Sequence, residues 1–168
     1  MNIHPLFVHF PIGLLVLYAV LEILPLTRWY PQAPWGAVKT VLLIFGAAGA
    51  VAASGTGEIA EKLLANEGAE ELIEVHKKFA TMATLIFGAL AYAYFVRWIS
   101  EHHRIFEGRL RPLSFLRTIA DIIMMRWAAV ILALIGLMAI TITGGLGAAI
   151  VYGPDADPLV TIIYSLFF

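Results

Sequence analysis

The sequence has 168 residues, of which 61% are hydrophobic and 14% charged, so it is more apolar and less charged than an ordinary soluble domain. Its formal net charge of -1 gives no electrostatic reason to expect nucleic acid binding, and we predict none. Cysteine is absent, which excludes disulfides, iron–sulfur clusters and covalently attached c-type haem. In a lipid bilayer, a chain of this length has room for about four helices of roughly 20 residues in one domain.

Four stretches are long and apolar enough to be membrane spans. They lie at about residues 5–26, 36–54, 79–100 and 127–152. Each is expected to be helical, because every backbone N–H and C=O in hydrocarbon needs a partner within its own segment. No Lys or Arg precedes the first stretch, so we interpret it as a retained span and not as a removable signal peptide. The sequence therefore predicts an all-α fold, a polytopic membrane four-helix bundle.

The segments outside the spans also carry helical patterns. Apolar residues recur at helical spacing on both sides of Asn66 and Gly68, which predicts an outer helical hairpin over 55–78 with a break at these two residues. Residues 113–125 mix charged and apolar side chains at helical period, which predicts a short amphipathic interfacial helix before the fourth span. The apolar tail 158–168 is too short to span, and the sequence leaves open whether it packs on this chain or on a partner.

The distribution of positive charge predicts the orientation of the spans. One side carries eight of the eleven Lys and Arg residues, which makes it the cytoplasmic side by the positive-inside rule. These eight residues are Arg28, Lys39, Arg97, Arg104, Arg109, Arg111, Arg117 and Arg126. Both termini are then expected on the periplasmic or outer side, with the acidic hairpin.

Histidines and glycines recur near the outer ends of three of the predicted spans. Because successive helices alternate in direction, these residues are expected at one level of the bundle: His4, His9, His76, Gly144, Gly145 and Gly147. A b-type haem in a membrane bundle needs two axial imidazoles on facing helices and small residues where the macrocycle passes. The pattern predicts His9 and His76 as axial ligands, with Lys77 or Lys78 near the propionates.

Two other interpretations of the same residues stay open. A metal ion such as copper, zinc or iron could be bound by His9 and His76, with His4 and Glu74 as further ligands. Alternatively there is no cofactor: His9 then bonds the backbone carbonyl that Pro11 leaves without a donor, and the glycines only allow close packing.

The other buried or clustered polar residues receive no chemical role from the sequence. His102 and His103 are expected to be solvated residues of a basic loop. Glu22, near the inner end of the first span, is expected to extend its carboxylate to the interface.

No catalytic motif is visible, since the chain lacks a nucleophile elbow, a phosphate-binding GxxxxGK[ST] loop and HExxH. The sequence leaves enzymatic activity undecided, and we expect no catalytic residues but an electron-transfer subunit that exchanges electrons with a partner on the outer face. The competing interpretation is a cofactor-free membrane anchor or assembly subunit that docks an outer partner. A homo-oligomer is compatible with either.

The opening HPLFVHFP, a histidine at the start of the third span and the close GGLGAAIVYG resemble a family of bacterial four-span membrane proteins of unknown function. The resemblance covers most of the chain. It implies a four-helix membrane domain in the bacterial inner membrane, with His4 and His9 as signature positions. It implies no established activity, although redox or haem roles are suspected for such proteins.

Overall fold

The computed structural model describes residues 4–64, 70–102 and 114–168, and for 4–7, 60–64 and 102 it describes the backbone alone. All regular elements in these ranges are helices, which confirms the all-α prediction. They are α1 (His4–Ile23), α2 (Leu26–Trp29), α3 (Trp35–Leu64), α4 (Glu70–His102), α5 (Ser114–Ile123), α6 (Arg126–Tyr152) and α7 (Pro158–Ser165).

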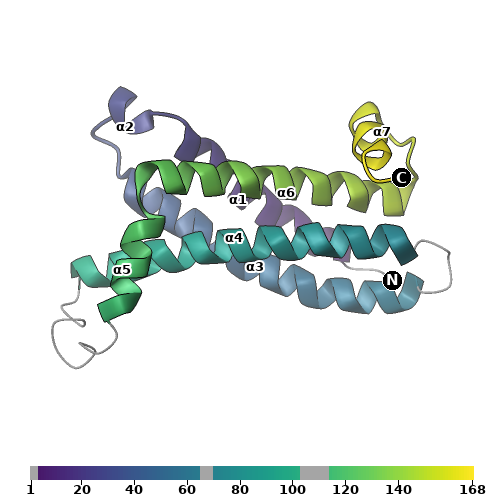
Figure 1. The fold of residues 1–168 in the computed structure, drawn as a ribbon, viewed down its shortest axis with the longest axis horizontal. Coiled ribbons are helices and arrows are strands. Elements are labelled where there is room, and N and C mark those ends of the chain that lie inside the picture. The colour runs from purple at the N-terminus through teal and green to yellow at the C-terminus, as the bar shows by residue number, and fades with distance from the viewer. Residues whose placement is uncertain (1–3, 65–69, 103–113) are drawn as a thin grey trace.

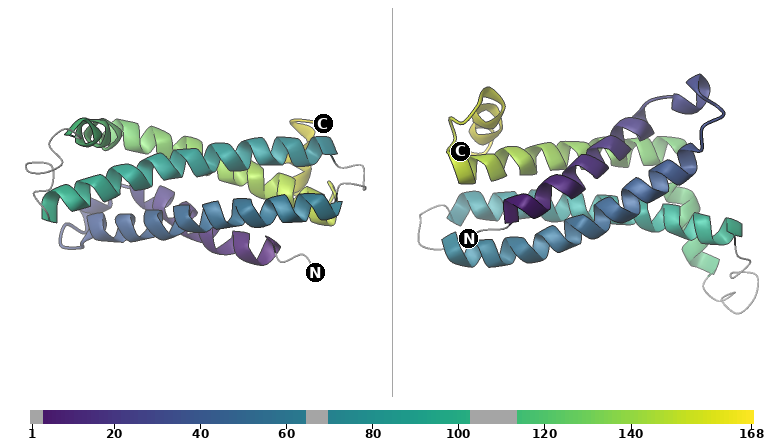
Figure 2. Two further views of the ribbon diagram at one scale, coloured as in Figure 1. Left: turned by 90° about the horizontal axis from the view of Figure 1, so that it is seen from below. Right: turned by 180° about the vertical axis from the view of Figure 1, so that it is seen from behind.

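The long helices α1, α3, α4 and α6 run side by side as an elongated bundle, and α1 crosses the others obliquely (Figures 1 and 2). Around the bundle, α1 packs against α3 and α6, and α4 packs against the same two helices. Thus α1 and α4 lie across the bundle from each other. The short helices α5 and α7 lie crosswise at opposite ends, and both ends of the chain lie at the end with α7 (Figure 1). We call this the α7 end and the other the α5 end.

Three helices are long and apolar enough to cross a membrane: Trp35–Ile59 of α3, Glu70–Glu101 of α4 and Arg126–Tyr152 of α6. The apolar part of α1, Val8–Ile23, is shorter. The second, third and fourth predicted spans therefore have helical counterparts of sufficient length.

The first long helix ends earlier than the predicted span. It stops at Ile23, three residues before the predicted limit of 26, and α2 follows after Pro25. The proline explains the difference, because its ring lacks an N–H and disfavours a helical conformation of the residue before it. At the other end of α1 the helix continues through Pro11, whose ring packs on α3.

The central core is built from aromatic and small residues. Tyr18 and Phe87 are fully buried, and their rings meet edge to face with centroids 6.2 Å apart. Phe87 lies over Gly136, where an added Cβ would be 2.8 Å from the ring. Close approach of α4 and α6 therefore requires glycine at this position.

The α3–α4 and α4–α6 connections differ in how far the structure describes them. α3 and α4 continue as helices well beyond the predicted spans, and the predicted break at Asn66 and Gly68 lies outside the described residues. Helix α5 falls within the predicted interfacial segment 113–125, and the Tyr92 hydroxyl donates to the Leu116 carbonyl at 3.1 Å, which ties α5 to α4.

The apolar tail forms α7 and packs on its own chain. Gly153, with a φ of 91°, ends α6 in a conformation that favours glycine, and Asp157 caps α7 by accepting hydrogen bonds from the backbone N–H groups of Leu159 and Val160. Val160 and Ile163 are buried. Ile163 packs on Gly145 of α6, so this side of α7 is occupied by the chain itself.

Candidate functional site

His76 is the best-defined polar side chain of the predicted outer layer. It is half-buried near the start of α4, and its Nδ1 lies 3.0 Å from the Thr143 carbonyl oxygen on α6. A carbonyl only accepts, so Nδ1 carries the proton in this contact and a neutral ring then has its lone pair on Nε2. This is the orientation that a metal-ligating imidazole usually has, because a hydrogen bond from the other nitrogen fixes the ring.

The glycine that accommodates His76 is Gly147. A Cβ there would lie 3.2 Å from Cε1 and 3.5 Å from Nδ1 of the imidazole. The two other predicted glycines have different surroundings. Gly144 is exposed, with open space where a Cβ would lie, and Gly145 contacts Ile163 of α7. Only one of the three glycines therefore lies against the histidine.

His9 differs from His76 in exposure. Its side chain is exposed on α1, which lies across the bundle from α4. The helix runs through Pro11, two residues after His9, without a break. Lys77 is exposed on α4, and of His4 only the backbone is described.

The small residues of α3 are used for packing against α1. Added Cβ atoms would lie 2.6 Å from Leu15 at Gly46 and 3.1 Å from Pro11 at Gly49. Among the described side chains, no group of three His, Asp or Glu residues is placed to hold a metal ion. His102 is described by its backbone alone, and His103 lies outside the described residues.

At the α5 end the bundle contains a buried ion pair, which the sequence analysis did not foresee. Lys39 Nζ of α3 lies 3.0 Å from Glu22 Oε2 of α1. Only 4% of Glu22 and 7% of Lys39 are exposed. The expectation that Glu22 extends to the interface is therefore wrong, because a cation on the neighbouring helix compensates its charge inside the bundle.

Two tyrosines complete this inner cluster, which consists of Glu22, Lys39, Tyr94 and Tyr18. The Tyr94 hydroxyl of α4 donates to Glu22 Oε2 at 2.6 Å. The Tyr18 and Tyr94 rings meet edge to face with centroids 5.9 Å apart. The Tyr18 side chain is fully buried, and its hydroxyl makes no hydrogen bond within the part of the chain that the structure describes. Three helices thus bring four polar side chains together.

One signal in the sequence does point to this pair. Glu22 is one residue from the end of α1, and Lys39 is four residues from the start of α3. Opposite charges just inside the adjoining ends of two consecutive antiparallel helices are placed to meet. The positive-inside rule uses Lys39 only as a positive residue that flanks a span.

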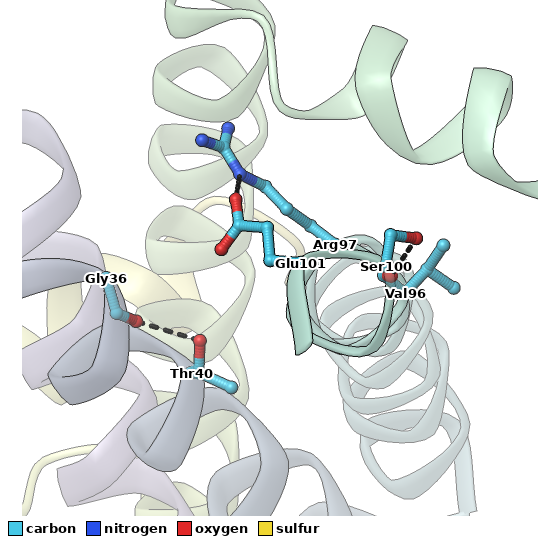
Figure 3. Close-up of polar contacts among 6 residues, drawn as sticks. All are labelled: Gly36, Thr40, Val96, Arg97, Ser100 and Glu101. Atoms are coloured by element: carbon cyan, nitrogen blue, oxygen red, sulfur yellow. Dashed lines mark hydrogen bonds and ion pairs between the residues drawn. The ribbon is translucent and has the colours of Figure 1, made fainter. Parts of the chain in front are cut away.

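Polar side chains at the surface of the α5 end bond mainly within their own helix, as Figure 3 shows. Arg97 donates to Glu101 at 2.8 Å, and Ser100 and Thr40 bond backbone carbonyls one turn earlier.

A cleft of about 300 Å³ between α4 and α5 is lined by Arg97, Ser100, Glu101, Arg117, Ala120 and Asp121. Positive and negative side chains alternate around it, so it has no strong preference for an anion or a cation.

Comparison with known proteins identifies a family for most of the chain. Residues 1–155 match the family described as "Predicted membrane protein (DUF2231)". Neither the curated proteins nor the solved structures give a match.

Proposed function

We propose that this chain, which belongs to the family of predicted membrane proteins DUF2231, is an integral membrane subunit that binds b-type haem, or another His-ligated metal, and transfers electrons within a redox complex. The observation that carries the proposal is the hydrogen bond between His76 Nδ1 and the Thr143 carbonyl. It orients the imidazole and places the lone pair of a neutral ring on Nε2, the atom proposed to bind the metal. His9 is proposed as the second axial ligand, and haem would supply the electron-accepting centre.

The proposal includes a topology of four spans in a bacterial inner membrane. α1 contains 20 residues, which at 1.5 Å per residue is about 30 Å, the thickness of the hydrocarbon core. It runs along the same bundle as the three longer apolar helices (Figure 2). The positive residues near the α5 end favour that end as cytoplasmic, and both termini, which share the α7 end, then face outward.

The test is an absorbance spectrum of the purified protein, loaded with haem, in oxidised and dithionite-reduced form. We expect a Soret band, with sharp α and β bands on reduction. His76→Ala and His9→Ala should each abolish or strongly shift these bands, whereas the matched control His102→Ala should leave them unchanged. Bands that persist unaltered in both His9 and His76 variants would remove the ligand assignment.

A pair of glycine variants tests the position of the imidazole without removing it. A Cβ at Gly147 would meet His76 at 3.2 Å, so Gly147→Ala must displace the ring by a few tenths of an ångström. We expect a shifted Soret maximum or a lower haem occupancy. Gly144→Ala is the matched control, because open space surrounds that position. Identical spectra for the two variants would count against His76 as a ligand.

A cofactor-free anchor or assembly subunit is the second candidate. It is favoured by the close packing of α1 on α3 at Gly46 and Gly49, where Leu15 and Pro11 fill the space that small residues leave. In this alternative the outer face docks another protein subunit, and a homo-oligomer is compatible with it. A featureless visible spectrum of protein extracted directly from its membrane, together with a failure to take up added haem, would favour the anchor over the haem subunit.

A further inference from the structure

We infer that the inner cluster is a proton-binding site, in which the Glu22 carboxylate takes up a proton from the aqueous phase at the α5 end of the bundle. This inference rests on the surroundings of the buried Glu22 carboxylate. Its Oε2 atom contacts the Lys39 ammonium and accepts a hydrogen bond from the Tyr94 hydroxyl, and the fully buried Tyr18 belongs to the same cluster. It is independent of any cofactor at the α7 end.

Folding alone gives little reason for ionisable groups at this position. A buried ion pair gains little over well-packed apolar side chains of similar volume, because both ions lose their hydration. Ionisable side chains inside a membrane bundle are costly and usually mark proton relays or ion pathways. Glu22 and Lys39 are each more than nine-tenths buried, so this reasoning applies to both.

The hydrogen bonds allow either protonation state of Glu22. In the ionised state Oε2 accepts from the Tyr94 hydroxyl and from the Lys39 ammonium. When a proton binds the carboxylate, the new O–H needs an acceptor. Tyr18 lies one helical turn before Glu22 on α1 with its ring against that of Tyr94, and its hydroxyl makes no hydrogen bond among the described residues. The site therefore offers a partner to the acid as well as to the carboxylate.

Lys39 keeps its own proton in this step. It lies four residues from the start of α3, so its flexible stem allows the ammonium to turn toward water when Glu22 becomes neutral. The other charged groups near the cluster are exposed. Arg97 of α4 pairs with Glu101, and Arg126 at the start of α6 lies at the surface. Among the groups of this cluster and these neighbours, Glu22 is therefore the buried carboxylate that can bind the proton.

The experiment is infrared difference spectroscopy of the full chain in liposomes between high and low pH. We expect acidification to produce a carboxylic acid C=O band, which Glu22→Gln removes. Glu101→Gln, which changes an exposed carboxylate of the same type, is the matched control and should keep the band. A band that survives in Glu22→Gln, or that is absent from the wild type at every pH at which the protein is folded, would overturn the proposal.

Tyr94→Phe tests the site without altering a charge. The Tyr94 hydroxyl bonds a carboxylate more strongly than a neutral acid, so without it the proton concentration at which the carboxylic acid band is half developed should fall about tenfold. A purely structural cluster would instead give a less stable protein with an unchanged band. Because no haem is needed for these measurements, their failure leaves the proposed haem site untouched, and the absence of haem would not affect them.

Discussion

The two ends of the bundle hold their helices together by different means. At the α5 end, Glu22, Lys39 and Tyr94 connect three helices through charged and hydrogen-bonded side chains that are closed off from solvent. At the α7 end, glycines let side chains of other helices approach closely, as Gly145 does for Ile163. Glu74 and Lys78 form an ion pair at that end whose side chains are two-thirds exposed. Burial, and not the number of charges, therefore decides where electrostatics matters in this protein.

The largest effect is expected from Lys39→Met, which leaves the Glu22 carboxylate buried without its cation. Removing one partner of a buried ion pair costs about 3 kcal/mol or more, because the remaining charge is neither hydrated nor compensated. The free energy of unfolding in mild detergent, measured by circular dichroism during denaturant titration, should fall by about that amount at neutral pH.

The matched control for this effect is the double variant Glu22→Gln with Lys39→Met. Both charges are then absent, so most of the stability should return to within about 1 kcal/mol of the wild type. A double variant as unstable as Lys39→Met alone would show that Lys39 stabilises the contact between α1 and α3 by something other than compensating the charge of Glu22.

A smaller effect, confined to the α7 end, is expected from Gly145→Ala. The new Cβ would lie 2.5 Å from Cδ1 and 3.1 Å from Cβ of Ile163, so α7 must move away from α6. Overpacking of this kind costs about 1 kcal/mol. Hydrogen exchange should become faster in residues 158–165 while that of α3 and α4 stays unchanged, and Gly144→Ala should alter neither. Faster exchange throughout the bundle would show that α7 is part of its core.

The helical architecture was largely predictable because it depends on apolar length and on backbone hydrogen bonding. Both can be inferred from a single chain. The errors lie at helix ends, where a single proline decides, as Pro25 does for α1. The helical tail is a similar case: Asp157 before Pro158 is a helix-start signal, but packing of Ile163 on a distant glycine depends on the folded chain.

The sequence predicted the depth of the candidate site residues along the bundle, but not the direction in which each side chain points. That direction depends on the rotation of each helix about its own axis. His9, His76 and the glycines of α6 were chosen by depth, yet His9 is exposed while His76 faces α6. Glu22 was misjudged for the same reason. Its position near the end of the first span suggested that the carboxylate reaches water. Instead the carboxylate points toward Lys39 and Tyr94 and is buried between the helices.

The smallest effect is expected from Lys78→Met at the α7 end. Lys78 Nζ lies 2.8 Å from Glu74 Oε1, closer than the 3.0 Å of the buried pair, so distance alone would rank this contact as the stronger one. Both of its side chains are about two-thirds exposed, however, and water hydrates either ion when the other is removed. We therefore expect no measurable change in the free energy of unfolding under the conditions used for Lys39→Met. A loss as large as that of the buried pair would mean that the α7 end is also stabilised by charge, and burial would no longer distinguish the two ends.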